Sequence, residues 1–171
     1  MSTDKRNGFL RQVEIALTVN GEQVSARVDA SRHLVDFLRL DLGLTGSHVG
    51  CEHGVCGACT LRVNGEIVRG CLMLAAQLDG AEVWTVEGLS ETNEMRALQE
   101  AFVARNALQC GFCTPGMLFS AADLIARGGR PDRAAIREHI SGNYCRCTGY
   151  ETIVDAIEAV AGRRRDESRS R

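Results

Sequence analysis

Apolar and polar positions alternate along the first part of this chain and change to a helical repeat further on. Residues 13–19 carry apolar side chains at every second position, which predicts a half-buried strand. Asn20 and Gly21 form a strong two-residue turn signal, and residues 24–28 alternate again. The chain is therefore expected to open with a β-hairpin. A second hairpin is predicted around Asn64 and Gly65.

The segments around the second hairpin complete the first half of the chain. Residues 33–43 have apolar side chains at helical spacing, with Ser31 placed to cap this helix and Gly43 to end it. Residues 71–78 indicate a short helical piece, and residues 81–86 a last strand. Two hairpins with a helix laid across them resemble a β-grasp, ferredoxin-like arrangement.

The period changes from two to 3.6 within residues 88–93, which are polar and turn-forming. Beyond them we expect four helices: at about 93–105, from Thr114, after Asp132 and from about Gly149, each with one apolar face. The predicted fold class is α+β. A β-grasp ferredoxin-like domain is expected at 1–88, a four-helix domain at 89–162, and a disordered basic tail at 163–171.

Composition places the chain among ordinary globular proteins, with 44% hydrophobic and 25% charged residues. A net charge of −2 gives no general attraction to nucleic acid. No apolar run approaches the roughly 18 residues of a membrane span, and the N-terminus lacks the apolar core of a secretory signal. We therefore expect a cytoplasmic protein, in which thiols stay reduced, so its eight cysteines are predicted to be metal ligands.

The first cysteine set has the spacing C-x4-C-x2-C followed by a fourth cysteine after the second hairpin. Its members are Cys51, Cys56, Cys59 and Cys71. This spacing is typical of the plant-type 2Fe–2S cluster. Gly50, Gly54 and Gly57 are interpreted as backbone requirements of a tight loop that turns N–H groups toward sulfur. Because four cysteines already fill the site, His53 is not expected to be a ligand.

The second cysteine set has the spacing C-x2-C, thirty-one residues, C-x-C. Its members are Cys110, Cys113, Cys145 and Cys147. Thr114-Pro115 predicts a helix that starts directly after Cys113, and Thr148 is placed to cap the last helix. Two helix N-termini would favour the negative charge of an iron–sulfur cluster, but a zinc ion held by four thiolates would benefit equally. The spacing favours iron–sulfur and leaves structural zinc open.

Three motifs in this order carry a family resemblance: G-C-E-H-G-V-C-G-A-C-T, A-L-Q-C-G-F-C-T-P-G-M and S-G-N-Y-C-R-C-T-G-Y. The chain resembles the small iron–sulfur subunit of the xanthine oxidase family of molybdenum hydroxylases. The resemblance covers roughly residues 10–160 and includes all eight cysteines. Tyr144 stands where leucine is common, which puts no cluster ligand in doubt.

The resemblance implies two 2Fe–2S clusters, one in each cysteine set. It also implies a large partner subunit that carries a molybdopterin-type Mo cofactor and a medium subunit that carries FAD, in a hetero-oligomer such as a dimer of heterotrimers. Electrons would pass from molybdenum to the helical-domain cluster, then to the ferredoxin-like cluster and on to FAD or another acceptor. Gln109 and Cys147 would contact the pterin.

The leading hypothesis is therefore an electron-transfer subunit whose substrate chemistry belongs to a partner chain. A free-standing two-cluster ferredoxin and a zinc-stabilised interaction module are the alternatives. Neither nucleic acid nor a membrane span is expected. Asn143 is interpreted as a turn former, and His33, His48 and His139 as surface or capping residues.

Overall fold

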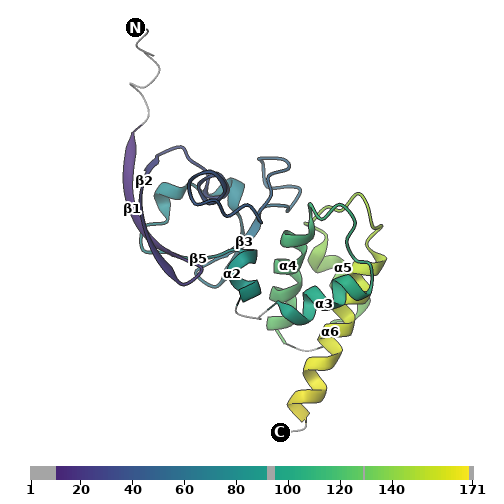
Figure 1. The fold of residues 1–171 in the computed structure, drawn as a ribbon. Coiled ribbons are helices and arrows are strands. Elements are labelled where there is room, and N and C mark those ends of the chain that lie inside the picture. The colour runs from purple at the N-terminus through teal and green to yellow at the C-terminus, as the bar shows by residue number, and fades with distance from the viewer. Residues whose placement is uncertain (1–10, 92–94, 129, 170–171) are drawn as a thin grey trace.

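The N-terminal half of the chain is built on a mixed five-stranded sheet of order β2-β1-β5-β3-β4 (Figure 1). The computed structural model describes residues 11–91, 95–128 and 130–169, and side chains as far as residue 162. Strands β1 (Gln12–Val19) and β2 (Glu22–Asp29) pair antiparallel. Asn20 and Gly21 connect them with φ of 52° and 86°, the left-handed values that such a turn needs. The first predicted hairpin is confirmed.

The second hairpin consists of β3 (Thr60–Val63) and β4 (Glu66–Arg69) and is likewise confirmed. Strand β5 (Glu82–Trp84) joins the two hairpins, since it runs parallel to β1 and antiparallel to β3. Its Val83 is fully buried and pairs with a residue on each side. The sheet therefore depends on a strand of three residues at its centre.

The helix between the hairpins begins later than predicted. Helix α1 (Leu34–Asp36) continues as a π-helical turn, η2 (Phe37–Asp41), and His33 rather than Ser31 precedes it. The Ser31 hydroxyl donates instead to Asp29 Oδ1 at 2.8 Å, because that carboxylate lies only two residues away. Gly43 has the predicted left-handed conformation, with φ of 71°. In place of one short helix after β4, two 3₁₀ turns form, η3 (Gly70–Leu72) and η4 (Ala75–Gln77).

The segment predicted as a polar linker is helical in its described part. Helix α2 (Val86–Glu91) occupies it and lies between the sheet and the other helices (Figure 1). Leu89 is 1% exposed, and Gly88 packs directly against the Asn20 side chain. Tertiary packing thus outweighs the turn-forming composition, which is a correction to the sequence-based expectation. Residues 92–94, and with them the predicted helix start near residue 93, lie outside the described ranges.

Helices follow the sheet in the remainder of the chain: α3 (Arg96–Ala104), α4 (Thr114–Ala126), α5 (Arg133–Ile140) and α6 (Glu151–Arg169). Helix α4 starts at Thr114-Pro115 as predicted, and the Asp132 carboxylate caps α5 by accepting from Ala135 N at 2.8 Å. Helix α6 extends to Arg169, whereas a disordered tail was predicted from residue 163. The sequence also predicts a loose arm at about residues 1–8, and these lie outside the described residues.

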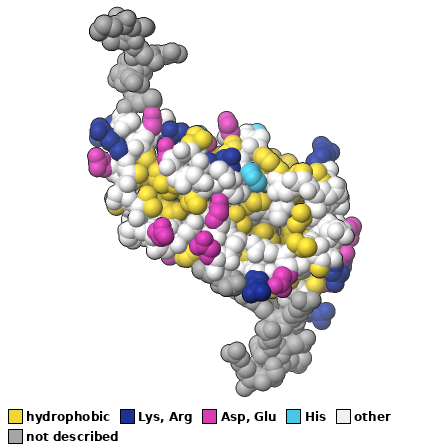
Figure 2. Space-filling model, viewed as in Figure 1, with side chains coloured by type: hydrophobic (Ala, Val, Ile, Leu, Met, Phe, Trp, Pro, Cys, Tyr) yellow, Lys and Arg dark blue, Asp and Glu magenta, His cyan; other side chains and the backbone are white. Residues whose placement is uncertain are grey.

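One apolar core joins the sheet to the helices. Leu61 and Val83 of the sheet and Met117 and Phe119 of α4 belong to the same buried cluster. Hydrophobic side chains that remain exposed are spread over both halves of the face in Figure 2. Within the described ranges, no helix has the length and apolar character needed to cross a membrane.

Candidate metal centres

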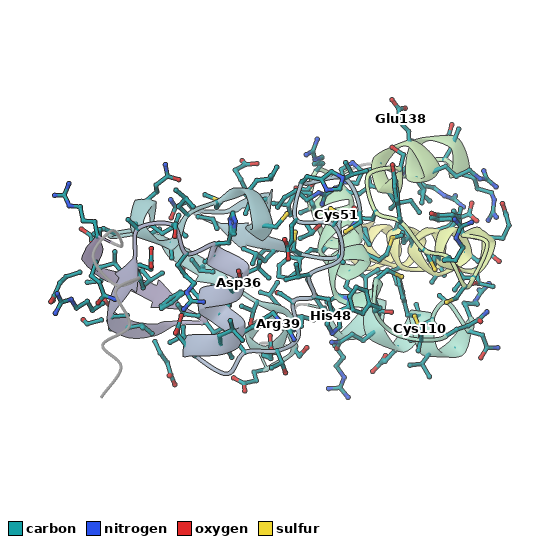
Figure 3. All side chains as sticks on the ribbon, turned by 90° about the horizontal axis from the view of Figure 1, so that it is seen from above. Asp36, Arg39, His48, Cys51, Cys110 and Glu138 are labelled. Carbon is teal, nitrogen blue, oxygen red and sulfur yellow. The ribbon has the colours of Figure 1, made fainter. Side chains whose placement is uncertain are left out.

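The first cysteine loop lies between η2 and β3, at the junction of the two halves, where Figure 3 labels Cys51. Cys56 N lies 3.4 Å from Cys51 Sγ, and both residues are partly exposed. Cys59 and Cys71 are each 2% exposed and pack beside Val35. Cys71 reaches this position because η3 directly follows β4, whose partner β3 begins one residue after Cys59. The β3–β4 hairpin therefore closes the set.

The environments of these thiols differ, and with them the ease with which each thiol ionises. Hydrogen bonds from the backbone of Cys56 and His53 lower the pKa of Cys51 to about 6. Burial raises the pKa of Cys71 to about 11, and the adjacent Cys59 thiol adds to the effect. Cys51 is thus a thiolate near neutral pH, while a bound metal would have to displace the proton of Cys71.

The loop glycines meet the backbone requirements that the sequence predicted. Gly54 and Gly57 have φ of 83° and 75°, in the left-handed region that favours glycine. The Gly54 N–H is directed toward Cys71 and lowers the pKa of its thiol, against the larger effect of burial. Gly50 has a different reason, since a Cβ there would lie 3.0 Å from Cys56 Sγ. The His53 ring is turned to the backbone and hydrogen-bonds Cys51 O.

The second cysteine set is assembled from the start of α4 and the turn before α6. Cys113 directly precedes α4, as predicted, and faces Cys145. Burial raises the pKa of Cys113 to about 12, and the Cys145 thiol reinforces this. Cys110 and Cys147 are exposed, and their sulfurs are 3.6 Å apart. Cys113 and Cys145 therefore form an inner pair, and Cys110 and Cys147 form an outer pair.

This pairing fits a two-iron core. The thiols lie against one another in pairs: Cys51 with Cys56, Cys59 with Cys71, Cys110 with Cys147, and Cys113 with Cys145. A 2Fe–2S cluster takes two protein ligands on each of its irons. The two sets thus have the donors and the arrangement that such clusters need.

Thr148 has a different position from the predicted one. Helix α6 begins at Glu151, and the Thr148 hydroxyl lies 3.2 Å from Cys145 Sγ. The same oxygen accepts a hydrogen bond from Tyr150 N at 3.2 Å, which leaves the hydroxyl proton available to the sulfur. Burial works against ionisation of Cys145, but the hydroxyl and backbone N–H of Thr148 lower its pKa. Thr148 is therefore a donor to a candidate cluster ligand.

Replacing Thr148 by valine is expected to lower the reduction potential of the second cluster. A hydrogen bond to a ligand sulfur stabilises the more negative, reduced state, and its loss should cost that state about 1 kcal/mol, or roughly 40 mV for one electron. Redox titration followed by EPR measures the shift. Thr148→Ser keeps the hydroxyl and should keep the potential; an equal shift in both variants would contradict the assigned donor.

The structure brings the two predicted pterin-contacting residues together at the surface. Gln109 Nε2 donates to Cys147 O at 3.1 Å, and both residues are exposed. Cys110, labelled in Figure 3, follows Gln109 and completes this outer edge of the second set. This edge therefore exposes the Gln109 amide and the sulfurs of Cys110 and Cys147 at the surface.

Three residues that connect the two cysteine loops were not recognised from the sequence. Asn143 is 2% exposed, and its side chain donates to Gly57 O at 3.1 Å. Arg69 donates to Gly142 O at 2.8 Å. His48, expected at the surface or as a cap, stacks on Phe112 with ring centroids 4.7 Å apart and hydrogen-bonds its carbonyl. No periodicity signals these residues, and for Asn143 the sequence predicted only a turn-forming role.

Comparisons with known proteins agree with this geometry. Residues 17–90 match the family model described as a 2Fe-2S iron-sulfur cluster binding domain, and residues 85–158 match a [2Fe-2S] binding domain. The chain is 51% identical over 150 residues to caffeine dehydrogenase subunit gamma of Pseudomonas sp. (strain CBB1), covering 86% of this chain and 90% of that one. It is 53% identical over 146 residues to the nicotine 6-hydroxylase small subunit of Paenarthrobacter nicotinovorans, covering 85% and 88%.

A solved structure shows the same fold. The structure of quinoline 2-oxidoreductase from Pseudomonas putida 86 contains a chain that superposes with a TM-score of 0.85 at 49% sequence identity. The superposition covers 91% of this chain and 97% of that one.

Proposed function

Because this chain belongs to the small iron–sulfur subunits of the xanthine oxidase family of molybdenum hydroxylases, we propose that it relays electrons within a heteromeric oxidoreductase. A bound 2Fe–2S cluster supplies one-electron redox chemistry, and the potential depends on hydrogen bonds to the sulfurs and on burial. The residues of this chain hold the clusters and set those hydrogen bonds. Substrate chemistry belongs to a partner subunit with a molybdopterin-type cofactor.

The observation that carries this proposal is the contact between the two cysteine loops. Tyr144 N donates to Cys56 O at 2.8 Å, so a residue beside one candidate ligand bonds directly to a candidate ligand of the other set. Two redox centres held by touching loops form a relay, whereas a zinc-stabilised interaction module has no need of such contact. The cysteine spacing and the paired thiols support the same conclusion.

The roles of individual residues follow from their exposure. We assign the first cluster to Cys51, Cys56, Cys59 and Cys71, and the second to Cys110, Cys113, Cys145 and Cys147. The second set has its outer pair and Gln109 at the surface, which suits entry of electrons from a pterin held by the large subunit. The first set would then deliver them to FAD or another acceptor.

We further propose division at residue 88 into a β-grasp domain and a four-helix domain that ends at residue 162.

Exposed apolar side chains around the cysteines support a heteromeric assembly. Five of the large hydrophobic residues exposed in the described ranges lie within two positions of a cysteine: Val55, Leu72, Leu108, Phe112 and Tyr144. We interpret their exposure beside the cysteines as a surface that partner chains cover. We propose large molybdopterin-binding and medium FAD-binding partners, in a cytoplasmic complex such as a dimer of heterotrimers.

Purification of the chain with its native partners tests the proposal. We expect a coloured protein with about four irons per chain, from two 2Fe–2S clusters, and two distinct EPR signals after dithionite reduction. Larger chains that contain molybdenum and FAD should co-purify. Bound zinc in a colourless protein would identify an interaction module instead. Two clusters with no associated chain would identify a free-standing ferredoxin.

A further inference from the structure

Asn143 places a buried side-chain amide at the point where the two cysteine loops meet. Its Nδ2 donates across the junction, to Gly57 O at 3.1 Å and to Thr60 Oγ1 at 3.3 Å. Its Oδ1 accepts from Ser120 Oγ of α4 at 2.9 Å. Asn143 is therefore bonded to both halves at once through atoms that are sealed from water.

Arg69 forms a second connection beside the first. Its guanidinium donates to Gly142 O at 2.8 Å and to Asn143 Oδ1 at 3.4 Å, and it also hydrogen-bonds Thr60 Oγ1. Arg69 ends β4, two residues before Cys71 in the sequence. The end of the second hairpin is thus tied to the turn that precedes Cys145.

The Asn143 side chain is not needed to form its own turn. The backbone makes that turn, because Asn143 N donates to Ile140 O at 2.9 Å. All four side-chain hydrogen bonds of Asn143 go to residues at least 23 positions away, and three of them go to the other half of the chain. Since buried polar groups are costly unless fully bonded, such a network fixes one arrangement of the loops.

We infer that Asn143 is a positioning residue that holds the two cluster-binding loops at one fixed separation, with Arg69 as its second arm. The bond that it protects is the one from Tyr144 N to Cys56 O, a backbone hydrogen bond between the loops. The expected effect on the interaction between the clusters rests on the proposed function, whereas the expected effect on the separation of the loops does not. Without the amide, the loops are still made by their own backbones but are no longer held in register.

Asn143→Ala, in the full chain assembled with its partners, tests this inference. The substitution removes the side-chain bonds across the junction, while Gly57 O keeps its bonds from Thr60 within its own half. Exchange of the Tyr144 amide hydrogen should therefore accelerate about 10- to 100-fold. In the dithionite-reduced complex, both cluster signals should persist in EPR while the magnetic interaction between them weakens. A residue that only stabilises the helical half would leave that interaction unchanged.

Two further variants keep the test decisive. Arg69→Met should also accelerate Tyr144 exchange and weaken the magnetic interaction, but by less. This variant tests the inference if Asn143→Ala does not fold. Ser120→Ala removes only the bond within the helical half and should leave both readouts close to wild type. Unchanged Tyr144 exchange and unchanged magnetic interaction in both Asn143→Ala and Arg69→Met would overturn the inference. If the wild-type chain binds no iron and Asn143→Ala still accelerates exchange of the Tyr144 amide hydrogen, the proposed function is overturned and the positioning role is kept.

Discussion

Replacement of Cys56 by serine is expected to abolish the first cluster and to leave the second one reducible. The thiolate is the metal ligand, and a serine hydroxyl does not ionise near neutral pH to replace it. The main-chain carbonyl of residue 56 survives the substitution, so its bond from Tyr144 N and the docking of the loops should remain. Iron content should fall by about half, since one of two 2Fe–2S clusters is lost.

EPR and rapid kinetics measure the two sides of this result. One of the two signals should disappear after reduction, and electron delivery to the flavin should fail while substrate still reduces the second cluster. Cys113→Ser is the reciprocal control and should remove the other signal. If Cys56→Ser removes both signals while the helices remain folded by circular dichroism, the two sites are not independent as proposed.

Gly116→Ala is expected to force the two halves apart. Gly116 lies in the first turn of α4, and a Cβ there would be 2.2 Å from Gly57 O and 3.1 Å from Asn143 Nδ2. The nearest obstacle is main chain of the first cysteine loop, which cannot move as a side chain can. Overpacking of this kind costs about 1–3 kcal/mol and should lower the thermal unfolding midpoint by roughly 3–10 °C.

A matched control separates the clash from the effect of alanine itself. Gly162 also lies in a helix, α6, and a Cβ there would meet nothing within 4 Å. Alanine is a better helix former than glycine by about 1 kcal/mol, so Gly162→Ala should raise the midpoint by roughly 2–4 °C. A midpoint that rises equally in both variants, measured by differential scanning calorimetry, would show that the loops yield without cost.

Local signals in the sequence predicted much of the fold correctly. Asn20-Gly21 and Asn64-Gly65 produced both hairpins, and Thr114-Pro115 started α4, because these residues impose backbone angles without help from the rest of the chain. The eight cysteines were recognised as two sets by spacing alone. Their assignment as cluster ligands is supported by the paired arrangement of their thiols.

Predictions that depended on competition between partners were wrong. Ser31 and Thr148 were expected to cap helices, but each hydroxyl binds a nearer partner, the Asp29 carboxylate and the Tyr150 N–H. Residues 88–91 were expected in a polar linker, yet burial of Leu89 draws them into α2. In each case the residue type was interpreted correctly as polar or turn-forming, but contacts with neighbouring residues determined the local structure that it adopts.

Ligand types, their spacing and the tight turns between them are properties of short segments, which is why they follow from the order of residues. The joining of the two cysteine loops is a property of the folded chain. Asn143 and Gly57 are 86 positions apart, and their contact leaves no periodic trace because it is a single hydrogen bond between polar atoms. Only the packing of α4 against the sheet brings them together, and glycine at positions 57 and 116 provides the space. The relay geometry therefore arises from tertiary contacts, while the identity of its centres arises from local sequence.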